Sequence, residues 1–500
     1  MKEVVSVSNM RKSDKYTIEN KTSSLKLMYE AGKKVFESTI WHGKTIIACG
    51  HGNNAGDGYV LAALLKENNF DVELLLLDER FSKDGKYYFD IATEKKVPWS
   101  VYNSSKGNAF EGCDIIVDCI FGTGFKGSVE GKAKEVIELI NQSTAYIVSV
   151  DINSGLDGDS GLGNISVKSD LTVSIGSIKS GHILNQAKDK IGQLINVDIG
   201  IDIIDPAFWL IEENDVRAFL GKRQSYSHKG TYGYVTLIGG SSEYSGAIKL
   251  ANLSASAMRS GAGVVRLAVP KSISCSVSPY LLESTLYMLD DIDGAIKFDE
   301  AALSGAIKGV KSVAIGMGLG QRGDNEKVLK YLLENCKVPL IIDADGINSL
   351  AKMDSSLIKN SACQVVLTPH LKEFERLCSV SIEKIQKNPI EYAKNYARQS
   401  GAVLLLKGNS TIVTDGEKVI LVNTGCAGMA SAGSGDVLSG IVAALCAAYD
   451  DTLMATAVGA YINGVAGEMA KDELCEISMV ASDTAKNVGK AISKILKSEI

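Results

Sequence analysis

The sequence predicts an α/β protein made of two domains, and three observations lead to that prediction. The chain has 500 residues, more than one hydrophobic core ordinarily accommodates. Short apolar runs of strand length alternate along it with helical patterns, which is typical of parallel sheets covered by helices. Near residue 215 an apolar segment gives way to charged and polar residues, as is common at domain boundaries. We therefore expect one domain over residues 1–215 and a second over residues 216–500.

Charge and cysteine usage restrict the class of protein. Hydrophobic residues make up 45% and charged residues 22% of the chain, so both domains have ample core material. The net charge of −6 and the interleaving of acidic with basic residues argue against nucleic-acid binding. The ten cysteines stand singly, which favours buried free thiols in a reducing compartment. No signal peptide and no run long enough to span a bilayer is present, so we expect a cytoplasmic protein without a membrane partner.

The first domain begins with a partial helical pattern over residues 1–43, for which we expect a structural role. A βαβ unit follows, and its connecting loop carries glycines without the GxGxxG spacing of dinucleotide-binding folds. The polar loop residues Asn53, Asn54 and Asp57 can hold hydroxyls, a carboxamide or a hard cation. The expected elements are a strand over Thr45–Cys49, a loop over Gly50–Gly58, a helix over Tyr59–Glu67 and a strand over Val72–Leu77.

Two further strands of this domain also end in polar, glycine-containing loops. In a parallel sheet all these loops emerge at one edge, so their side chains can converge on one crevice. Oxygen atoms from Asn54, Asp118 and Ser154 would suit a weakly held alkali cation, which leaves Asp151 for proton transfer. Taken singly, Asp151 can be a turn-capping residue and Asp118 a buried hydrogen-bond acceptor; taken together, the four favour a site. The two strands are expected over Asp114–Ile120 and Ala145–Val150.

Three motifs in this half resemble the N-terminal domain of the NAD(P)H-hydrate repair enzymes, over about residues 10–210. They are Gly50-His-Gly-Asn-Asn-Ala-Gly-Asp-Gly58, Phe121-Gly-Thr-Gly124 and Asp151-Ile-Asn-Ser-Gly155. Ala55 replaces a usual glycine and Asn153 a usual proline, so the turns change slightly while every functional group is kept. The resemblance implies a Rossmann-like three-layer domain that epimerises hydrated nicotinamide nucleotides.

The same resemblance implies residue roles in the first domain. Asp151 would be the epimerase acid/base, and Asn54, Asp118 and Ser154 would hold a potassium ion. The residues expected to bind the hydrated nucleotide are Asn53, Asn54, Ala55, Gly56, Asp57, Gly122, Thr123, Gly124, Phe125, Lys126, Gly127, Ser128 and Asp151.

The second domain repeats the alternation of strands and helices. His370 follows a proline that stops one strand and begins a helix; beside Glu373 it can meet a polar ligand, or it can act only as a capping residue. Asp415-Gly416 predicts a tight hairpin. We expect strands over Val235–Ile238, Val264–Val269, Val313–Ile315, Leu340–Ile342, Val365–Leu367 and Val403–Leu406, and helices over Ser245–Met258, 437–448 and 453–466, the last two belonging to the core.

A glycine-dense stretch over Gly428–Gly440 joins a turn, a carboxylate and an apolar helix. Glycines 433 and 435 let the backbone approach a ligand, and the N–H groups that open the next helix suit a phosphate. Asp436 is the one charged residue there, a plausible base or metal partner. The alternative is a carboxylate favoured by the dipole at the helix N-terminus.

A set of motifs in one order resembles the C-terminal domain of the same repair enzymes, a ribokinase-like fold, over about residues 222–495. They include Lys229-Gly-Thr-Tyr-Gly233, Gly316-Met-Gly-Leu-Gly320, Asp343-Ala-Asp345, Thr368-Pro-His370 and Gly433-Ser-Gly-Asp436. Met317 and Gly346 depart from the usual proline and alanine, which affects fine substrate affinity. The resemblance implies an ADP- or ATP-dependent dehydratase that uses magnesium. The nucleotide would meet Lys407, Gly408, Asn409, Ser410, Thr411 and Gly435, and the hydrated dinucleotide would meet Ala247, Gly318, His370 and the catalytic Asp436.

The sequence therefore predicts a bifunctional repair enzyme for hydrated NADH and NADPH, assembled as a homo-oligomer by resemblance. Its first domain would interconvert the R and S hydrates, and its second would dehydrate the S form at the expense of ADP or ATP. One alternative is a ribokinase-like small-molecule kinase fused to a non-catalytic Rossmann-like binding module. Another is a scaffold related to RNA-decapping proteins, which the acidic composition disfavours.

Overall fold

The computed structural model describes residues 1–105, 109–205, 207–253 and 259–497 of the chain, with the backbone of Lys106, Ser254 and Ala255 as well. The chain divides into two compact units, one over Glu3–Phe208 and one over Trp209–Ile500 together with Met1–Lys2. The division precedes residue 215 because strand β10 (Phe208–Leu210) pairs in parallel with β21 (Val419–Val422) and so belongs to the sheet of the second unit. None of the described helices is long and apolar enough to cross a membrane.

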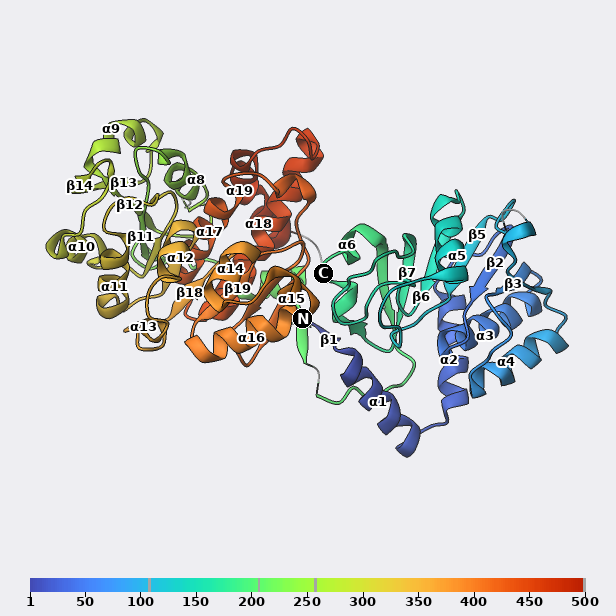
Figure 1. Ribbon diagram of the computed structural model, residues 1–500. Coiled ribbons are helices and arrows are strands. Elements are labelled where there is room, and N and C mark those ends of the chain that lie inside the picture. The colour runs from blue at the N-terminus through green and yellow to red at the C-terminus, as the bar shows by residue number, and fades with distance from the viewer. Residues whose placement is uncertain (107–108, 206, 256–258, 498–500) are drawn as a thin grey trace. The chain divides into compact units, whose positions relative to one another are not determined.

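The first unit is built around a seven-stranded sheet in the order β4-β3-β2-β5-β6-β7-β9, in which every adjacent pair is parallel. A buried parallel sheet needs helices on both faces. Helices α2, α3 and α4 lie on one side of it and α5 on the other (Figure 1). Its strands are β2 (Lys44–Cys49), β3 (Asp71–Leu76), β4 (Trp99–Val101), β5 (Ile115–Cys119), β6 (Tyr146–Val150), β7 (Ser169–Ile175) and β9 (Ile191–Val197), and its helices are α1 (Val7–Asn20), α2 (Ser24–Glu37), α3 (Asn53–Glu67), α4 (Lys83–Glu94), α5 (Gly131–Gln142) and α6 (Ala187–Lys190).

Helix α3 begins at Asn53, so the expectation of a loop up to Gly58 is wrong. Gly52 has the extended backbone of an N-cap residue, and the asparagine pair forms the first turn. The glycines inside this stretch serve close packing, not a loop. A Cβ at Gly56 would lie 2.4 Å from Met28 Sδ, and one at Gly58 would lie 2.9 Å from Cys119 Sγ. Helix α3 therefore packs closely against the sheet, and its first turn lies at the carboxyl ends of the strands.

The second unit is also an α/β layer structure, with the sheet order β13-β12-β11-β16-β17-β18-β19-β20-β21-β10. The pairs from β13 to β19 are parallel, and β19, β20 and β21 form an antiparallel meander that contains the expected hairpin at Asp415-Gly416. Its strands include β11 (Tyr234–Ile238), β12 (Val264–Pro270), β13 (Thr285–Leu289), β16 (Ser312–Ile315), β17 (Leu340–Ile342), β18 (Val365–Leu367), β19 (Val403–Leu406) and β20 (Thr411–Thr414), with a separate hairpin of β14 (Asp291–Ile292) and β15 (Ala295–Ile296).

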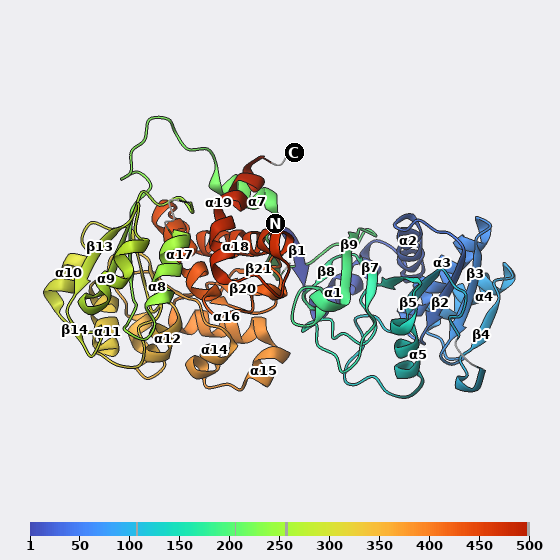
Figure 2. The same ribbon diagram turned by 90° about the horizontal axis from the view of Figure 1, so that it is seen from above.

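Apolar helices fill one face of this second sheet. Helices α8, α17, α18 and α19 share a core with the strands, so the two helices expected at 437–448 and 453–466 are core elements. Figure 2 shows α11, α14 and α16 on the opposite side of the strands. The helices are α7 (Glu213–Leu220), α8 (Ser245–Ala255), α9 (Ser274–Val277), α10 (Glu300–Ile307), α11 (Asn325–Asn335), α12 (Ala344–Leu350), α13 (Ser356–Lys359), α14 (Leu371–Cys378), α15 (Ile382–Lys387), α16 (Pro389–Ser400), α17 (Ser434–Ala448), α18 (Thr452–Leu474) and α19 (Ala481–Lys497). The remainder of the helix expected to end at Met258, residues 256–258, lies outside the described residues.

All ten cysteines are free thiols, but the expectation that they are buried holds only in part. Cys49, Cys119, Cys336 and Cys446 are buried in the cores, whereas Cys275 and Cys475 are exposed. Apolar neighbours in the sequence do not show whether a cysteine in a short surface element is buried, because burial depends on the tertiary packing.

Candidate active sites

A cavity of about 750 Å³ opens at the carboxyl ends of the strands in the first unit. This is the edge at which parallel α/β sheets bind ligands. Its lining includes several residues expected to bind substrate: Asn53, Asn54, Asp57, Gly122, Thr123, Gly124, Phe125, Lys126 and Asp151. Of the other residues in that expectation, Ala55 and Gly56 are buried within the first turn of α3, and Gly127 and Ser128 lie outside the lining.

The first turn of α3 faces this cavity with its backbone donors uncapped, since Gly52 supplies no side-chain hydrogen bond. Such a helix start attracts anions. Asn54 donates through Nδ2 to the Phe121 carbonyl (2.9 Å), while its buried Oδ1 has no hydrogen-bond partner among the described residues. An unpaired buried acceptor is costly unless a ligand or ion completes it.

The residues expected to hold a cation lie together beside this asparagine. Ser154 Oγ donates to Asp118 Oδ1 at 2.5 Å, and it also lies 3.3 Å from the Phe121 carbonyl that Asn54 bonds. Asp118 is fully buried and accepts further hydrogen bonds from Ser149 Oγ and from the N–H groups of Ser154 and Ile120. Burial raises the pKa of the Asp118 carboxyl, although these donors oppose the rise. The donor set of amide, hydroxyl and carboxylate oxygens fits a hard alkali cation.

Asp151 adopts a left-handed backbone conformation, with φ of +65°. This conformation is unfavourable for a residue with a Cβ and is maintained by its surroundings. The buried His182 lies 2.7 Å through Nε2 from the Asp151 carbonyl, and its Nδ1 accepts the N–H of Lys179 at 3.0 Å. Because Nδ1 is an acceptor, the proton is on Nε2 and the ring is neutral. Burial, aided by Lys179, lowers the pKa of His182 to about 4, so the ring stays neutral at pH 7.

Lys179 controls the charge of Asp151. The Lys179 ammonium group is 1% exposed and lies 2.5 Å from Asp151 Oδ1; it also donates to the Ile175 carbonyl at 2.8 Å. Thr123 N–H approaches the other carboxylate oxygen at 3.3 Å. Burial alone would raise the pKa of Asp151, but the ammonium group outweighs it and holds that pKa below its ordinary value. Asp151 is therefore an ionised carboxylate at neutral pH.

Of the other carboxyl groups that line the same cavity, Asp57 and Asp14 have pKa values shifted in the opposite direction. Burial, followed by the negative charges of Asp151 and Asp14, raises the pKa of Asp57 well above its ordinary value. Burial also raises the pKa of Asp14 to about 6, with Lys179 opposing and Asp151 reinforcing the rise. The cavity thus brings the ionised Asp151 together with two carboxyl groups, Asp57 and Asp14, that are easily protonated.

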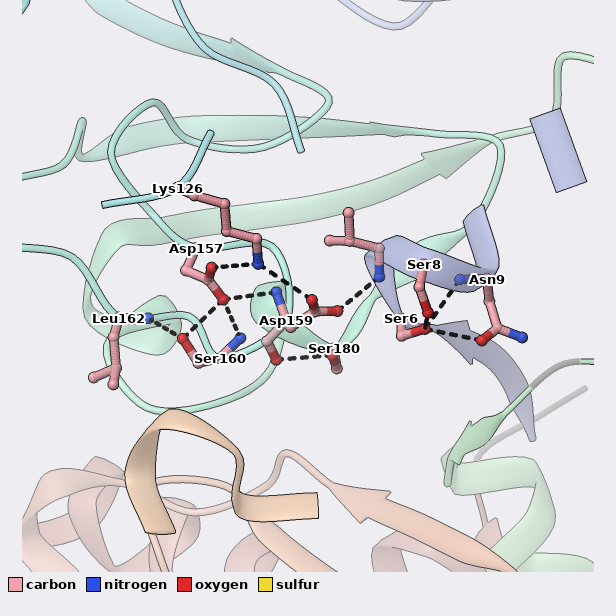
Figure 3. Close-up of polar contacts among 10 residues, drawn as sticks. Ser6, Ser8, Asn9, Lys126, Asp157, Asp159, Ser160, Leu162 and Ser180 are labelled. Carbon is pink, nitrogen blue, oxygen red and sulfur yellow. Dashed lines mark hydrogen bonds and ion pairs between the residues drawn. The ribbon is translucent and has the colours of Figure 1, made fainter. Parts of the chain in front are cut away.

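One lysine anchors the loop expected to bind substrate, residues 122–128, through two ion pairs. Lys126 Nζ pairs with Asp157 Oδ2 at 2.7 Å and with Asp159 Oδ2 at 3.4 Å (Figure 3). The other oxygen of Asp159 accepts the N–H of Val7 at 2.7 Å, at the start of α1. A Cβ at Gly122 would lie 3.2 Å from both Asp151 Oδ2 and Asn54 Cβ, so a larger residue there would crowd this close approach of the loop.

In the second unit the corresponding cluster forms around a partly buried lysine. Lys407, directly after β19, pairs with Asp343 Oδ1 at 2.8 Å and reaches Glu373 Oε2 at 4.0 Å. Ser439 Oγ donates to the other Asp343 oxygen at 2.6 Å. Burial works against each charge, but the pairing lowers the pKa of Asp343 and raises that of Lys407.

Asp436 stands in the first turn of α17, beside this ion pair. Burial, followed by the charge of Asp343, raises the pKa of Asp436 to about 7, and Lys407 limits the rise. A carboxylate poised near neutral pH can exchange protons in both directions. Gly435 permits the contact, since a Cβ there would lie 3.1 Å from Lys407 Nζ.

The remaining residues expected in the second site fall into three places. Gly318 has φ of +68°, and its hypothetical Cβ would lie 2.9 Å from Ala247 Cβ, so these two form one wall. His370 acts as the N-cap of α14: its Nδ1 accepts N–H groups of Lys372 and Glu373, and burial lowers its pKa. The turn between β19 and β20 is formed by Gly408, Asn409 and Ser410, and Thr411 begins β20. In that turn, Ser410 Oγ donates a hydrogen bond to Asn423 Oδ1 at 2.8 Å.

Sequence reasoning missed Lys179 and Asp14. A lysine next to an apolar strand run is a signal that could have found Lys179, because such a buried cation needs an anion. Asp14 carries no comparable signal. It stands in a helical segment expected to be structural, and only the fold brings it to the cavity.

Both units of the chain, each with its carboxylate–lysine cluster, match known protein families. Residues 235–490 match the family described as NAD(P)H-hydrate dehydratase, and residues 24–181 match the family described as YjeF-related protein N-terminus. The bifunctional NAD(P)H-hydrate repair enzyme of Moorella thermoacetica is 34% identical over 92% of this chain and 91% of its own. This chain belongs to the family of bifunctional NAD(P)H-hydrate repair enzymes.

Two solved structures resemble the second unit of this family member. The ADP/ATP-dependent NAD(P)H-hydrate dehydratase from Bacillus subtilis, co-crystallised with ATP and Mg²⁺, is 31% identical, with a TM-score of 0.50 over 58% of this chain and 98% of its own. A ribokinase-like superfamily protein from Enterococcus faecalis is 22% identical, with a TM-score of 0.50 over 59% of this chain and 99% of its own, and shows the fold. The expected ribokinase-like fold of the second half is thereby confirmed.

Proposed function

We propose that this family member repairs hydrated NADH and NADPH, interconverting the R and S hydrates in its first unit and dehydrating the S hydrate in its second. One observation carries the proposal: each unit holds its own acid–base carboxylate beside a lysine, fully buried in the first unit and partly buried in the second. Asp151 lies at Lys179 in one unit, and Asp436 lies near Lys407 in the other. A hydrate with two configurations at C6 needs two such centres, because one stereospecific pocket accepts only one epimer.

In the first unit, the open first turn of α3 would take the pyrophosphate, and Asp151 would move the proton of the C6 hydroxyl. We also propose that Asn54, Asp118 and Ser154 hold a potassium ion there. The unpaired, buried Oδ1 of Asn54 supports this proposal. When bound, the cation would balance the buried Asp118 charge and steady the loops that end β5 and β6.

In the second unit, ADP or ATP would lie against Lys407 to Thr411 and Gly435. Asp436 would take the proton of the substrate hydroxyl as a phosphoryl group reaches that oxygen, which turns a poor leaving group into a good one. Ala247, Gly318 and His370 would contact the hydrated dinucleotide. No cluster of three or more His, Cys, Asp or Glu side chains suited to a metal occurs among the described residues. This fits magnesium that arrives with the nucleotide phosphates and supplies charge neutralisation.

The free thiols support a reducing compartment, and we place the protein in the cytoplasm as a homo-oligomer that binds neither nucleic acid nor membrane. Sedimentation of the full chain tests the assembly.

The decisive experiment mixes the full chain with epimeric NADH hydrate and follows the reduced-nicotinamide absorbance with ADP, with ATP and without nucleotide. Complete nucleotide-dependent recovery of both epimers is expected. Recovery of the S fraction alone would refute the epimerase half. Appearance of a stable phosphorylated product instead would refute the dehydratase half and favour a small-molecule kinase.

A further inference from the structure

Helix α1 brings a carboxyl group into the cavity of the first unit from a segment ahead of the family match at residues 24–181. Asp14 and Met10, one helical turn apart, both line the cavity. The helix is held firmly. Its N-terminal N–H at Val7 donates to Asp159. The buried hydroxyls Ser13 Oγ and Thr17 Oγ1 each accept a backbone N–H at 3.0 Å from the segment 202–204.

Holding α1 at both ends of its buried face fixes the direction of Asp14. Ser13 and Thr17 are fully buried, so the helix cannot rotate without breaking both hydrogen bonds. A functional group on a pinned helix is placed more precisely than one on a loop. Within the described residues the Asp14 carboxyl forms no hydrogen bond or ion pair, so it can contact a ligand in the cavity.

We propose that Asp14 is the second proton-transfer residue of the epimerase site and works as the partner of Asp151. This inference rests on the epimerase activity proposed above and adds to it a residue on α1. Asp151 is ion-paired and Asp14 is not, although both face one cavity. Two carboxyl groups whose surroundings push their ionisation apart are suited to opposite roles, one as base and one as acid.

The chemistry of the substrate requires both roles. The C6 carbon carries a hydroxyl and is bonded to the ring nitrogen N1, so it is a hemiaminal centre. Asp151 takes the hydroxyl proton, the O–H electron pair forms the carbonyl, and the C6–N1 pair moves to N1. N1 takes the proton of Asp14. Rotation about C5–C6 and the reverse transfers close the ring on the other face, so both carboxyl groups return to their starting states.

The electrostatic surroundings agree with this division. Burial raises the pKa of Asp14 to about 6, whereas Lys179 keeps Asp151 ionised despite its burial. The other charged or titratable groups that face the cavity are Arg11 of the same helix, His51, Asp57 and Asp84 from the α3 and α4 side, Lys126 of the loop 122–128, and Lys179.

The test measures R–S interconversion by the full chain between pH 5 and 9 for wild type, D14N, D14E and the control E19Q. Glu19 is on the same helix with a side chain 60% exposed, so its loss removes an equal charge outside the cavity. We expect D14N to lose at least about 100-fold in rate, the usual contribution of a positioned acid. Wild type should slow as pH rises through the Asp14 pKa; D14N should lose this dependence, and D14E should keep it at a displaced pH.

Dehydration of pure S hydrate by the same samples reports on the second unit, and their thermal unfolding reports on the folding of the first unit. Normal dehydration with lost interconversion in D14N supports the proposal. A wild-type rate and pH profile in D14N, or an equal loss in E19Q, overturns it while leaving the epimerase function standing. Wild type that fails to interconvert the epimers refutes the proposed function itself, and the inference with it. If D14N does not fold, the pH profile of D14E decides. A D14E rate that falls at the same pH as the wild-type rate overturns the proposal.

Discussion

Replacing Lys179 by methionine tests how Asp151 is kept ionised. The lysine side chain is 1% exposed and that of Asp151 16%, so the substitution leaves a nearly buried carboxylate without its cation. The Ile175 carbonyl loses its donor as well. Removing one partner of a buried ion pair costs about 3–5 kcal/mol. For a unit of this size, that corresponds to a fall in melting temperature of about 6–20 °C.

The pH dependence of this loss has a definite sign. In wild type the pKa of Asp151 lies below its unfolded value, so its stabilising contribution is present above the unfolded pKa and is lost as pH falls through the folded pKa. In K179M burial is opposed only by weaker groups such as the Thr123 N–H, so that pKa rises, which destabilises the fold as pH rises. The deficit should therefore be larger at pH 7 than at pH 4.

Thermal unfolding of the full chain measures the deficit, and hydrogen exchange across residues 146–179 assigns it to the first unit. The control K134M removes an exposed lysine, 52% accessible and 3.9 Å from Glu138, and should cost less than about 1 kcal/mol. The double variant D151N/K179M should be less destabilised than K179M. A K179M protein as stable as K134M at pH 7, or a deficit that grows toward acid pH, would refute the reasoning.

Three further predictions concern the other groups. D436N should lower the dehydration rate by about 100-fold or more while interconversion stays normal. The wild-type dehydration rate should rise with pH through about 7 as the base ionises. Equal dehydration rates in D436N and wild type would refute the role of Asp436. G435A should weaken nucleotide binding roughly tenfold, a KM effect seen in ADP titrations, since its Cβ would crowd Lys407; its matched control is G246A, where a Cβ meets nothing within 4 Å. Potassium chloride should raise the melting temperature of wild type relative to choline chloride, and N54A should abolish that difference; an unchanged response would exclude a cation at Asn54.

The sequence was informative about the fold because strands buried on both faces are continuous apolar runs. Leu340–Ile342, Val365–Leu367 and Val403–Leu406 are strands with the expected bounds. The polar residues that follow each strand were predictable for the same reason, since parallel strands end at one edge. Helix α3 was harder, because glycines at its start resemble a loop until the packing against Met28 and Cys119 is visible.

The pairing of charges was beyond the sequence. Asp151 and Lys179 are separated by a loop and a strand, and only the fold places the ammonium group 2.5 Å from the carboxylate. Asp14 is more distant still, on a helix with a polar composition typical of a solvated surface. Long-range contacts of this kind depend on tertiary packing, which single-sequence patterns do not contain.

The burial of Lys179 also determines how the protein should respond to ionic strength. Mobile ions screen charges that face water and hardly reach a pair enclosed by protein. Salt should therefore slow the encounter with an anionic dinucleotide while leaving the proton transfer that follows it almost unaffected. In kinetic terms, rising salt should appear in KM and hardly in kcat, so the chemistry at Asp151 would remain constant across the range of ionic conditions that a cell experiences.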